Sequence, residues 1–128
     1  LNGGFTYNWD FGFSAGLLGR FETGTPVNAY YAGIDYDNSG ELPSGGRGNL
    51  GRTPNTLNFD STFTYTWKLK GAKTLAFRAD VFNLFNVHKV TTVDQNYEAS
   101  VGVYDNNFMN AMTYQSSRRI RLGVKFTF

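Results

Sequence analysis

Residues 57–69 have the sequence L-N-F-D-S-T-F-T-Y-T-W-K-L, in which apolar and polar side chains alternate. The odd-numbered positions carry Leu57, Phe59, Phe63, Tyr65, Trp67 and Leu69, and the even-numbered positions carry Asn58, Asp60, Thr62, Thr64, Thr66 and Lys68. Because successive side chains of a β-strand point to opposite faces, the pattern predicts a strand with one apolar and one polar face. Thirteen residues at about 3.3 Å each, tilted near 40°, rise roughly 30 Å, whereas a soluble strand usually has only about 5–6 residues.

Four further segments show the same alternation. They are L-N-G-G-F-T-Y-N-W (1–9), F-G-F-S-A-G-L-L-G-R-F-E (11–22), T-L-A-F-R-A-D-V-F-N (74–83) and R-R-I-R-L-G-V-K-F-T-F (118–128). In the last segment the apolar side chains run from Ile120 to Phe128, and Arg119, Arg121 and Lys125 occupy the other face. We therefore predict five long strands and no amphipathic helix.

The connections between these strands alternate in length. Residues 8–10 and 70–73 are expected to form tight turns, whereas residues 23–56 and 84–117 form long polar connections. Short turns at one end and long loops at the other are typical of outer-membrane barrels, and loops this long are unusual in soluble meanders unless they are functional.

Composition narrows the class of protein. Aromatic residues and charged residues each make up 17% of the chain, which also has 15 glycines, no cysteine and a mean hydropathy of −0.37. The net charge of +2 is small and dispersed, which argues against a nucleic-acid partner. The lack of cysteine excludes a disulfide scaffold and thiol chemistry. There is neither an apolar run of about 18 residues for a spanning helix nor a signal peptide at Leu1.

Two interpretations of the strand pattern stay open at this point. In a soluble sandwich or lipocalin-like barrel, the odd-numbered apolar residues would form a core. In a membrane barrel they would face lipid, and strand length together with loop asymmetry favours this second interpretation. Five strands cannot close a barrel, since single-chain bacterial barrels have an even number of at least about eight and open edges are costly in hydrocarbon. We therefore predict an all-β fold in which residues 1–128 form an antiparallel up-and-down meander, the C-terminal part of a larger transmembrane β-barrel.

Four stretches of the sequence resemble a known family. They are G-R-F-E-T-G-T-P-V-N (19–28), G-R-T-P-N-T-L-N-F-D (51–60), R-A-D-V-F-N-L-F-N (78–86) and Y-Q-S-S-R-R-I-R-L-G-V-K-F-T-F (114–128). Together they are similar to the end of a TonB-dependent outer-membrane receptor, and most similar to the Oar-like branch of that family. The D-V-F-N-L-F-N and R-L-G-V-x-F-x-F pieces are the more specific ones, and the resemblance covers nearly the whole chain.

The resemblance implies a barrel of about 22 strands with a plugged lumen, in the bacterial outer membrane, crossing it many times. It implies transport or receptor activity energised through TonB, with the plug and the TonB-binding segment N-terminal to Leu1. The expected partners are outer-membrane lipid and TonB. A passive porin, or a structural or adhesin barrel, is the alternative function.

The terminal strand is similar to the signal that the barrel-assembly machinery recognises in outer-membrane proteins. In this interpretation Phe126 and Phe128 face lipid near the periplasmic interface, where the chain ends, and Trp9 and Trp67 lie at the same level. A plain amphipathic edge strand would explain the alternation equally well.

One loop stretch matches part of a calcium-binding pattern. In I-D-Y-D-N-S-G-E (34–41), Asp35, Asp37, Ser39 and Gly40 occupy positions 1, 3, 5 and 6 of the calcium-loop pattern. Position 12 is Gly46, so the bidentate Glu is missing. A solvated turn is the other interpretation, and we favour it.

The loops also carry aromatic side chains that are candidates for ligand binding. They are Tyr30, Tyr31, Tyr36, Tyr97, Tyr104 and Tyr114. Exposed tyrosines stack readily on ligands, but they equally pack loops together. His88 has no second His or Cys with which to chelate a metal, and we expect it on the surface. The sequence contains no recognisable set of catalytic groups, so we do not expect an enzyme.

The face assignments predict contacts between strands. If Leu75 lies near Phe126, antiparallel pairing sets Asp80 opposite Arg121, and we predict an ion pair between them that faces the lumen. A stagger of two residues would instead set Asp80 opposite Gly123 or Arg119, and contact of Asp80 with the plug or water is a further alternative. Both strands that flank residues 70–73 carry their apolar side chains at odd numbers, so directly paired residues must have an even sum. This parity rule requires a loop of three or five residues there. Because the strands alternate in direction, both long connections lie at the same end of the barrel, and we expect them outside the cell.

Overall fold

The computed structural model describes residues 1–32 and 48–128. Its described part forms two compact units. The sheet unit comprises Leu1–Glu22, Leu57–Val87 and Ser116–Phe128, and the loop unit comprises Thr23–Thr56 and His88–Gln115. No helix in residues 1–32 and 48–128 is long and apolar enough to span a membrane.

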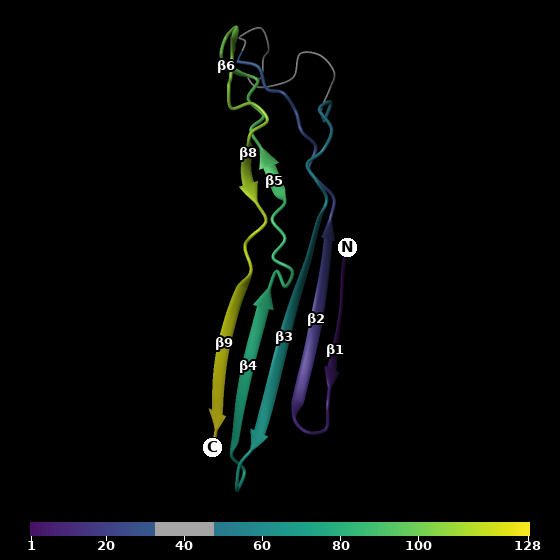
Figure 1. The fold of residues 1–128 in the computed structure, drawn as a ribbon, viewed down its shortest axis with the longest axis vertical. Helices are drawn as coiled ribbons and strands as arrows, with labels where there is room; N and C mark the ends of the chain where they lie inside the picture. Colours follow the sequence, from purple (N-terminus) through teal and green to yellow (C-terminus); the bar gives the residue numbers. More distant parts are fainter. Residues whose placement is uncertain (33–47) are drawn as a thin grey trace. The chain divides into compact units, whose positions relative to one another are not determined.

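The sheet unit is a meander of five strands, as predicted (Figure 1). Its strands are β1 (Asn2–Asn8), β2 (Phe13–Glu22), β3 (Thr56–Lys68), β4 (Thr74–Phe82) and β9 (Arg119–Thr127), hydrogen-bonded in the order β1-β2-β3-β4-β9. β1 is antiparallel to β2, β3 to β4, and β4 to β9. The predicted strand ends agree with the observed ones to within about two residues.

The register between β4 and β9 is the predicted one. Leu75 lies opposite Phe126, and Asp80 lies opposite Arg121. The turn between β3 and β4 is confirmed as an odd-numbered loop, because the amide of Leu69 donates to the Lys73 carbonyl at 2.9 Å and leaves three residues between them. Gly71, in the middle of that loop, has a φ of 75°.

The first tight turn lies later in the sequence than predicted. The amide of Trp9 donates to the Phe13 carbonyl at 2.8 Å, so the loop is residues 10–12 rather than 8–10. Gly12 explains the shift, because it has a φ of 89°, in the left-handed region that glycine adopts without strain. A Cβ on Gly12 would also lie 2.5 Å from the Thr66 carbonyl oxygen.

The two faces of the sheet differ in chemistry, and the apolar face is uncovered. Leu122 and Ile120 are 77% and 65% exposed, and Phe77 is 42% exposed. Within the described residues the buried apolar side chains are Val27 and Ala29, which belong to the loop unit. The soluble alternative required the strand residues to form a core, and the described residues do not form one.

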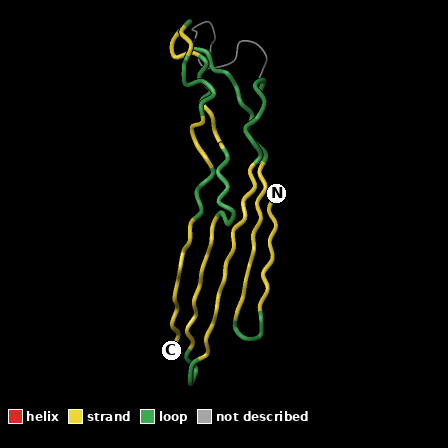
Figure 2. The backbone as a smooth tube through the Cα atoms, in the orientation of Figure 1, coloured by secondary structure: helices red, strands yellow, loops and turns green. Residues whose placement is uncertain are grey.

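The loop unit contains strands that the sequence analysis did not predict. They are β5 (Val90–Val93), β6 (Glu98–Ser100), β7 (Val103–Tyr104) and β8 (Ala111–Tyr114), paired as β5-β8 and β6-β7 (Figure 2). Both pairs contain register shifts, which interrupt the period of two. Strands this short and irregular carry no recognisable alternation in sequence, so residues 84–117 looked like an unstructured connection.

Candidate functional site

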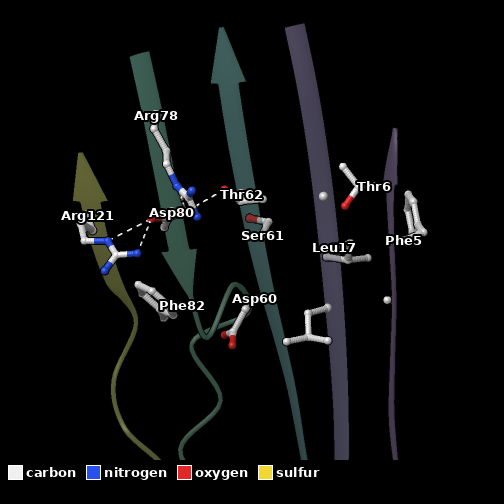
Figure 3. A pocket seen from close by; sticks show the side chains of 13 residues that line it. Phe5, Thr6, Leu17, Asp60, Ser61, Thr62, Arg78, Asp80, Phe82 and Arg121 are labelled. Carbon is white, nitrogen blue, oxygen red and sulfur yellow. Dashed lines mark hydrogen bonds and ion pairs between the residues drawn. The ribbon is translucent and has the colours of Figure 1, made fainter. Parts of the chain in front are cut away.

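The polar face of the sheet unit is organised around one carboxylate (Figure 3). Asp80 of β4 is only 4% exposed, although the sheet is a single layer. Its Oδ1 accepts a hydrogen bond from Thr62 Oγ1 at 2.7 Å and another from Arg78 Nε at 2.9 Å. Its Oδ2 accepts from Nε and Nη2 of Arg121 at 2.9 and 2.7 Å. The buried carboxylate therefore connects β3, β4 and β9.

Strand geometry brings these four side chains together. Thr62 lies directly opposite Asp80 on β3, and Arg121 lies directly opposite it on β9. Arg78 is two residues earlier on β4 and so shares its face. The expected ion pair between Asp80 and Arg121 is therefore present, and its orientation toward a lumen stays a prediction. The contributions of Thr62 and Arg78 were missed, although both follow from the same parity.

An asparagine corner fixes the end of β4. Asn83 is 4% exposed and has a φ of 52°, a left-handed conformation that asparagine tolerates better than most residues. Its Nδ2 donates to the carbonyls of Val87 and Ser116 at 2.9 and 2.8 Å. Its backbone amide donates to Asp60 Oδ1 at 2.9 Å. Asn86 has a φ of 53°, and its Oδ1 accepts a hydrogen bond of 3.0 Å from the backbone amide of Arg118. The corner thus ties β4 to the segment that leads into β9.

A groove of about 580 Å³ runs across the polar face beside Asp80. It is lined by Gly4, Thr6, Gly16, Leu18, Phe82 and Arg121, among others, so it extends from β1 to β9. A Cβ on Gly16 would lie 3.0 Å from Thr62 Cγ2, and a Cβ on Gly4 would lie 2.8 Å from the Leu17 carbonyl oxygen, so neighbouring atoms approach both glycines closely. This groove was not predicted from the sequence, because it depends on which residues of five strands lie side by side.

Two arginines lie over one aromatic ring that lines the groove. The guanidinium carbons of Arg119 and Arg121 each lie 5.6 Å from the centre of the Phe82 ring, within the range of a cation–π contact. Arg78 reaches the same carboxylate as Arg121. Asp60 also lines the groove, so this part of the polar face carries three cations and two anions, a small excess of positive charge.

The tyrosines of the loop unit pack against one another. Tyr97 is the centre, with ring centroids 4.9 Å from Tyr31, 5.3 Å from Tyr104 and 5.1 Å from Phe108. The hydroxyl of Tyr30 accepts a hydrogen bond from the Asn28 side chain. This arrangement supports the interpretation that the tyrosines hold the loops together.

Ligand binding by the tyrosines stays a prediction. Tyr104 is 53% exposed and Tyr114 57%, so both rings are still accessible. Tyr36 lies outside the described residues.

The predicted calcium ligands Asp35, Asp37 and Ser39 also lie outside the described residues. Within residues 1–32 and 48–128 there is no group of three or more His, Cys, Asp or Glu residues that could hold a metal ion. The calcium interpretation stays a prediction. His88 is exposed, as expected.

Two of the stretches that carried the family resemblance lie against each other in the loop unit. Thr25 and Thr53 exchange two hydrogen bonds of 2.9 Å, from the Thr25 amide to Thr53 Oγ1 and from the Thr53 amide to the Thr25 carbonyl. The Gly24 amide donates to Asn55 Oδ1, and its carbonyl accepts from Arg52 Nε. A Cβ on Gly24 would lie 1.6 Å from the Thr53 carbonyl oxygen, so only glycine fits here.

Large aromatic side chains are exposed at the tight-turn end of the sheet. Phe126 and Phe128 stack with their centroids 5.9 Å apart and are 51% and 92% exposed. Trp9 and Trp67, beside the two tight turns, are 40% and 54% exposed. This is the arrangement expected of an aromatic girdle.

Comparison with known proteins gives one informative match. The chain is 31% identical to the TonB-dependent transporter Oar of Myxococcus xanthus over an alignment of 152 positions, which covers 90% of this chain and 14% of that protein. The chain therefore spans about one seventh of the length of this relative. No family model and no solved structure matches the chain.

Proposed function

We propose that this chain, a segment of a TonB-dependent receptor of the Oar-like branch, forms the C-terminal part of an outer-membrane barrel that takes up an unidentified ligand with energy supplied through TonB. The relative is a transporter, which supports a transport role and a non-enzymatic one. The comparisons do not support the alternative of a passive porin or a structural barrel.

One observation carries the barrel proposal: the sheet has an uncovered apolar face and a charged polar face. β3 is 13 residues long, which at about 3.3 Å each is enough to cross the roughly 25 Å apolar band of such a barrel even when tilted. Soluble monomers rarely expose contiguous apolar patches of more than a few hundred Å². Lipid on the apolar face and water or a plug on the polar face would satisfy both surfaces.

The direction of the strands supports a proposal for the orientation of the barrel in the membrane. Both tight turns and the end of β9 lie at one end of the sheet (Figure 1). The exposed rings of Trp9, Trp67, Phe126 and Phe128 belong to residues at this end. We propose that this end is periplasmic and that the two long connections start from the extracellular end. We also propose that β9, through Phe126 and Phe128, is recognised by the barrel-assembly machinery.

Uptake is tested on cells rather than on the segment. Growth media would be compared by mass spectrometry after incubation with cells that carry the receptor, lack it, or carry it in the presence of a proton uncoupler. We expect at least one compound to be depleted only when both the receptor and the proton gradient are present. Depletion that the uncoupler leaves unchanged would contradict energised uptake and indicate a passive pore.

A further inference from the structure

We propose that the groove beside Asp80 is a binding site for a small organic carboxylate, whose charged group is held by Arg78 and Arg121. The proposal concerns binding alone and does not depend on energised uptake. It is carried by the geometry of two guanidinium groups and by the shape of the groove next to them.

Asp80 binds both guanidinium groups but cannot accept a hydrogen bond from every N–H group that they carry. A carboxylate has about four acceptor positions, and Asp80 uses two on each oxygen. Among the described residues, no hydrogen bond involves the Nη atoms of Arg78 or the Nη1 of Arg121. Donors therefore remain on both side chains, which are 57% and 67% exposed.

This arrangement is preorganised for an anion. The buried carboxylate fixes one edge of each guanidinium group, so that little side-chain freedom is lost when the free edge binds an oxyanion. Gly123 lies directly opposite Arg78, and no described atom comes within 4 Å of the position a Cβ would occupy there. Arg78 therefore has no side chain directly opposite it on β9.

The groove itself accommodates the rest of such a molecule. Its volume of about 580 Å³ falls in the range of roughly 300–1,000 Å³ that is usual for small-molecule sites. Gly4 and Gly16 form its floor, and Leu18 and Phe82 provide apolar contacts. An anionic group near the arginines and a small apolar body beside Leu18 and Phe82 match this lining.

The test uses the full receptor, purified in a non-ionic detergent, and 4-fluorobenzoate as the probe. Binding is measured by fluorine NMR, with the uncharged 4-fluorobenzamide as a matched compound. We expect Arg121→Gln to weaken benzoate binding by about tenfold or more, the usual effect of losing hydrogen bonds to a charged group. Thr6→Phe, opposite Gly16, leaves the arginines unchanged but fills the groove, and we expect a similar loss.

Lys125→Gln is the matched control, because Lys125 is a cation on the same face of β9, opposite Ala76, that does not line the groove. We expect this variant to bind as the parent does. The folded state of each variant is verified by its resistance to SDS before heating. Equal binding of the amide, equal losses in all three variants, or no benzoate binding to the folded receptor would each overturn the proposal. The last result includes the case in which another part of the receptor fills the groove.

Discussion

Asp80 shows how one residue can connect three strands of a single-layer sheet. It is 4% exposed because Thr62, Arg78 and Arg121 converge on its two oxygens. A buried charge is tolerated only when it is paired and hydrogen-bonded, and here every acceptor position is used. The carboxylate thus ties β4 to both of its neighbours.

We expect Asp80→Asn to destabilise the sheet. The amide keeps the shape of the side chain but loses the charge and half of the acceptor positions, which leaves two arginines without their partner. The midpoint of urea unfolding of the receptor, followed by tryptophan fluorescence, should fall. Asp10→Asn is the control, since Asp10 is exposed in the first tight turn, and its midpoint should not change. Equal midpoints for the two variants would contradict the role of Asp80.

Position 24 requires glycine because the backbone of Thr53 approaches it closely. A Cβ here would lie 1.6 Å from the Thr53 carbonyl oxygen, a contact that backbone atoms cannot relieve without moving. We expect Gly24→Ala to cost about 1–3 kcal/mol locally, as overpacking does. Hydrogen exchange of the Val27 and Thr53 amides, both hydrogen-bonded across this contact, should become roughly tenfold faster or more.

Gly3→Ala is the matched control for Gly24→Ala. A Cβ on Gly3 meets no described atom within 4 Å. Its substitution should leave the exchange of the Val27 and Thr53 amides unchanged. Slow exchange of these amides in Gly24→Ala would show that the two stretches do not approach each other as described.

At the scale of elements, the β4–β9 pair decides which side chains meet. Ala79 lies opposite Leu122 on the apolar face, next to the pair formed by Asp80 and Arg121. A shift of two residues would preserve both faces but move Asp80 opposite Gly123. Only the observed register sets Asp80 directly opposite Arg121, whereas a shift in the other direction would set it opposite Arg119.

A pair of introduced cysteines tests this register, since the chain has none of its own. We expect Ala79→Cys with Leu122→Cys to form a disulfide on mild oxidation, because directly opposed Cα atoms are about 4.5–5.5 Å apart. Ala79→Cys with Val124→Cys, two residues away, should not. Mass spectrometry of the digested receptor identifies the linked peptides. Preferential linkage of the second pair would show a register shifted by two.

For the whole molecule, the direction of the strands predicts which ends face outward. β2 and β4 end, and β3 and β9 begin, at the end of the sheet opposite the tight turns. Epitope tags inserted after Leu50 and after Val101, one in each long connection, should both be labelled on intact cells. A tag inserted after Gly71, in the tight turn, should be labelled only after permeabilisation. Labelling of only one long connection would contradict the topology.

The terminal aromatic residues predict an effect on assembly. We expect Phe128→Ala to reduce the amount of receptor in the outer-membrane fraction severalfold, because β9 loses an aromatic ring through which we propose that the assembly machinery recognises it. Phe11→Ala is the control, since Phe11 is another exposed aromatic residue beside a tight turn, at 64% exposure. Immunoblots of fractionated cells measure both. Equal reductions would show that Phe128 acts only as a girdle residue.

The sequence by itself determined the five strands and their two faces, and it predicted the pairing of Asp80 with Arg121 once Leu75 was assumed to lie near Phe126. These follow from alternation, which is a local property, and from the parity rule that side chains on one face must meet their counterparts. The odd number of residues in the turn before Lys73 follows from the same rule, and the structure selected three rather than five. The first turn was predicted two residues too early, because only Gly12 shows where the left-handed residue lies.

Only the tertiary structure decided the groove, the corner at Asn83 and the paired loop stretches. Each depends on residues far apart in the chain: Gly16 lies near Thr62, Asn83 reaches Ser116, and Gly24 lies against Thr53. Alternation places a side chain on a face, but it does not say which residue of another strand lies beside it. That neighbour is set by how far each strand slides along the next one, a quantity that no single strand contains.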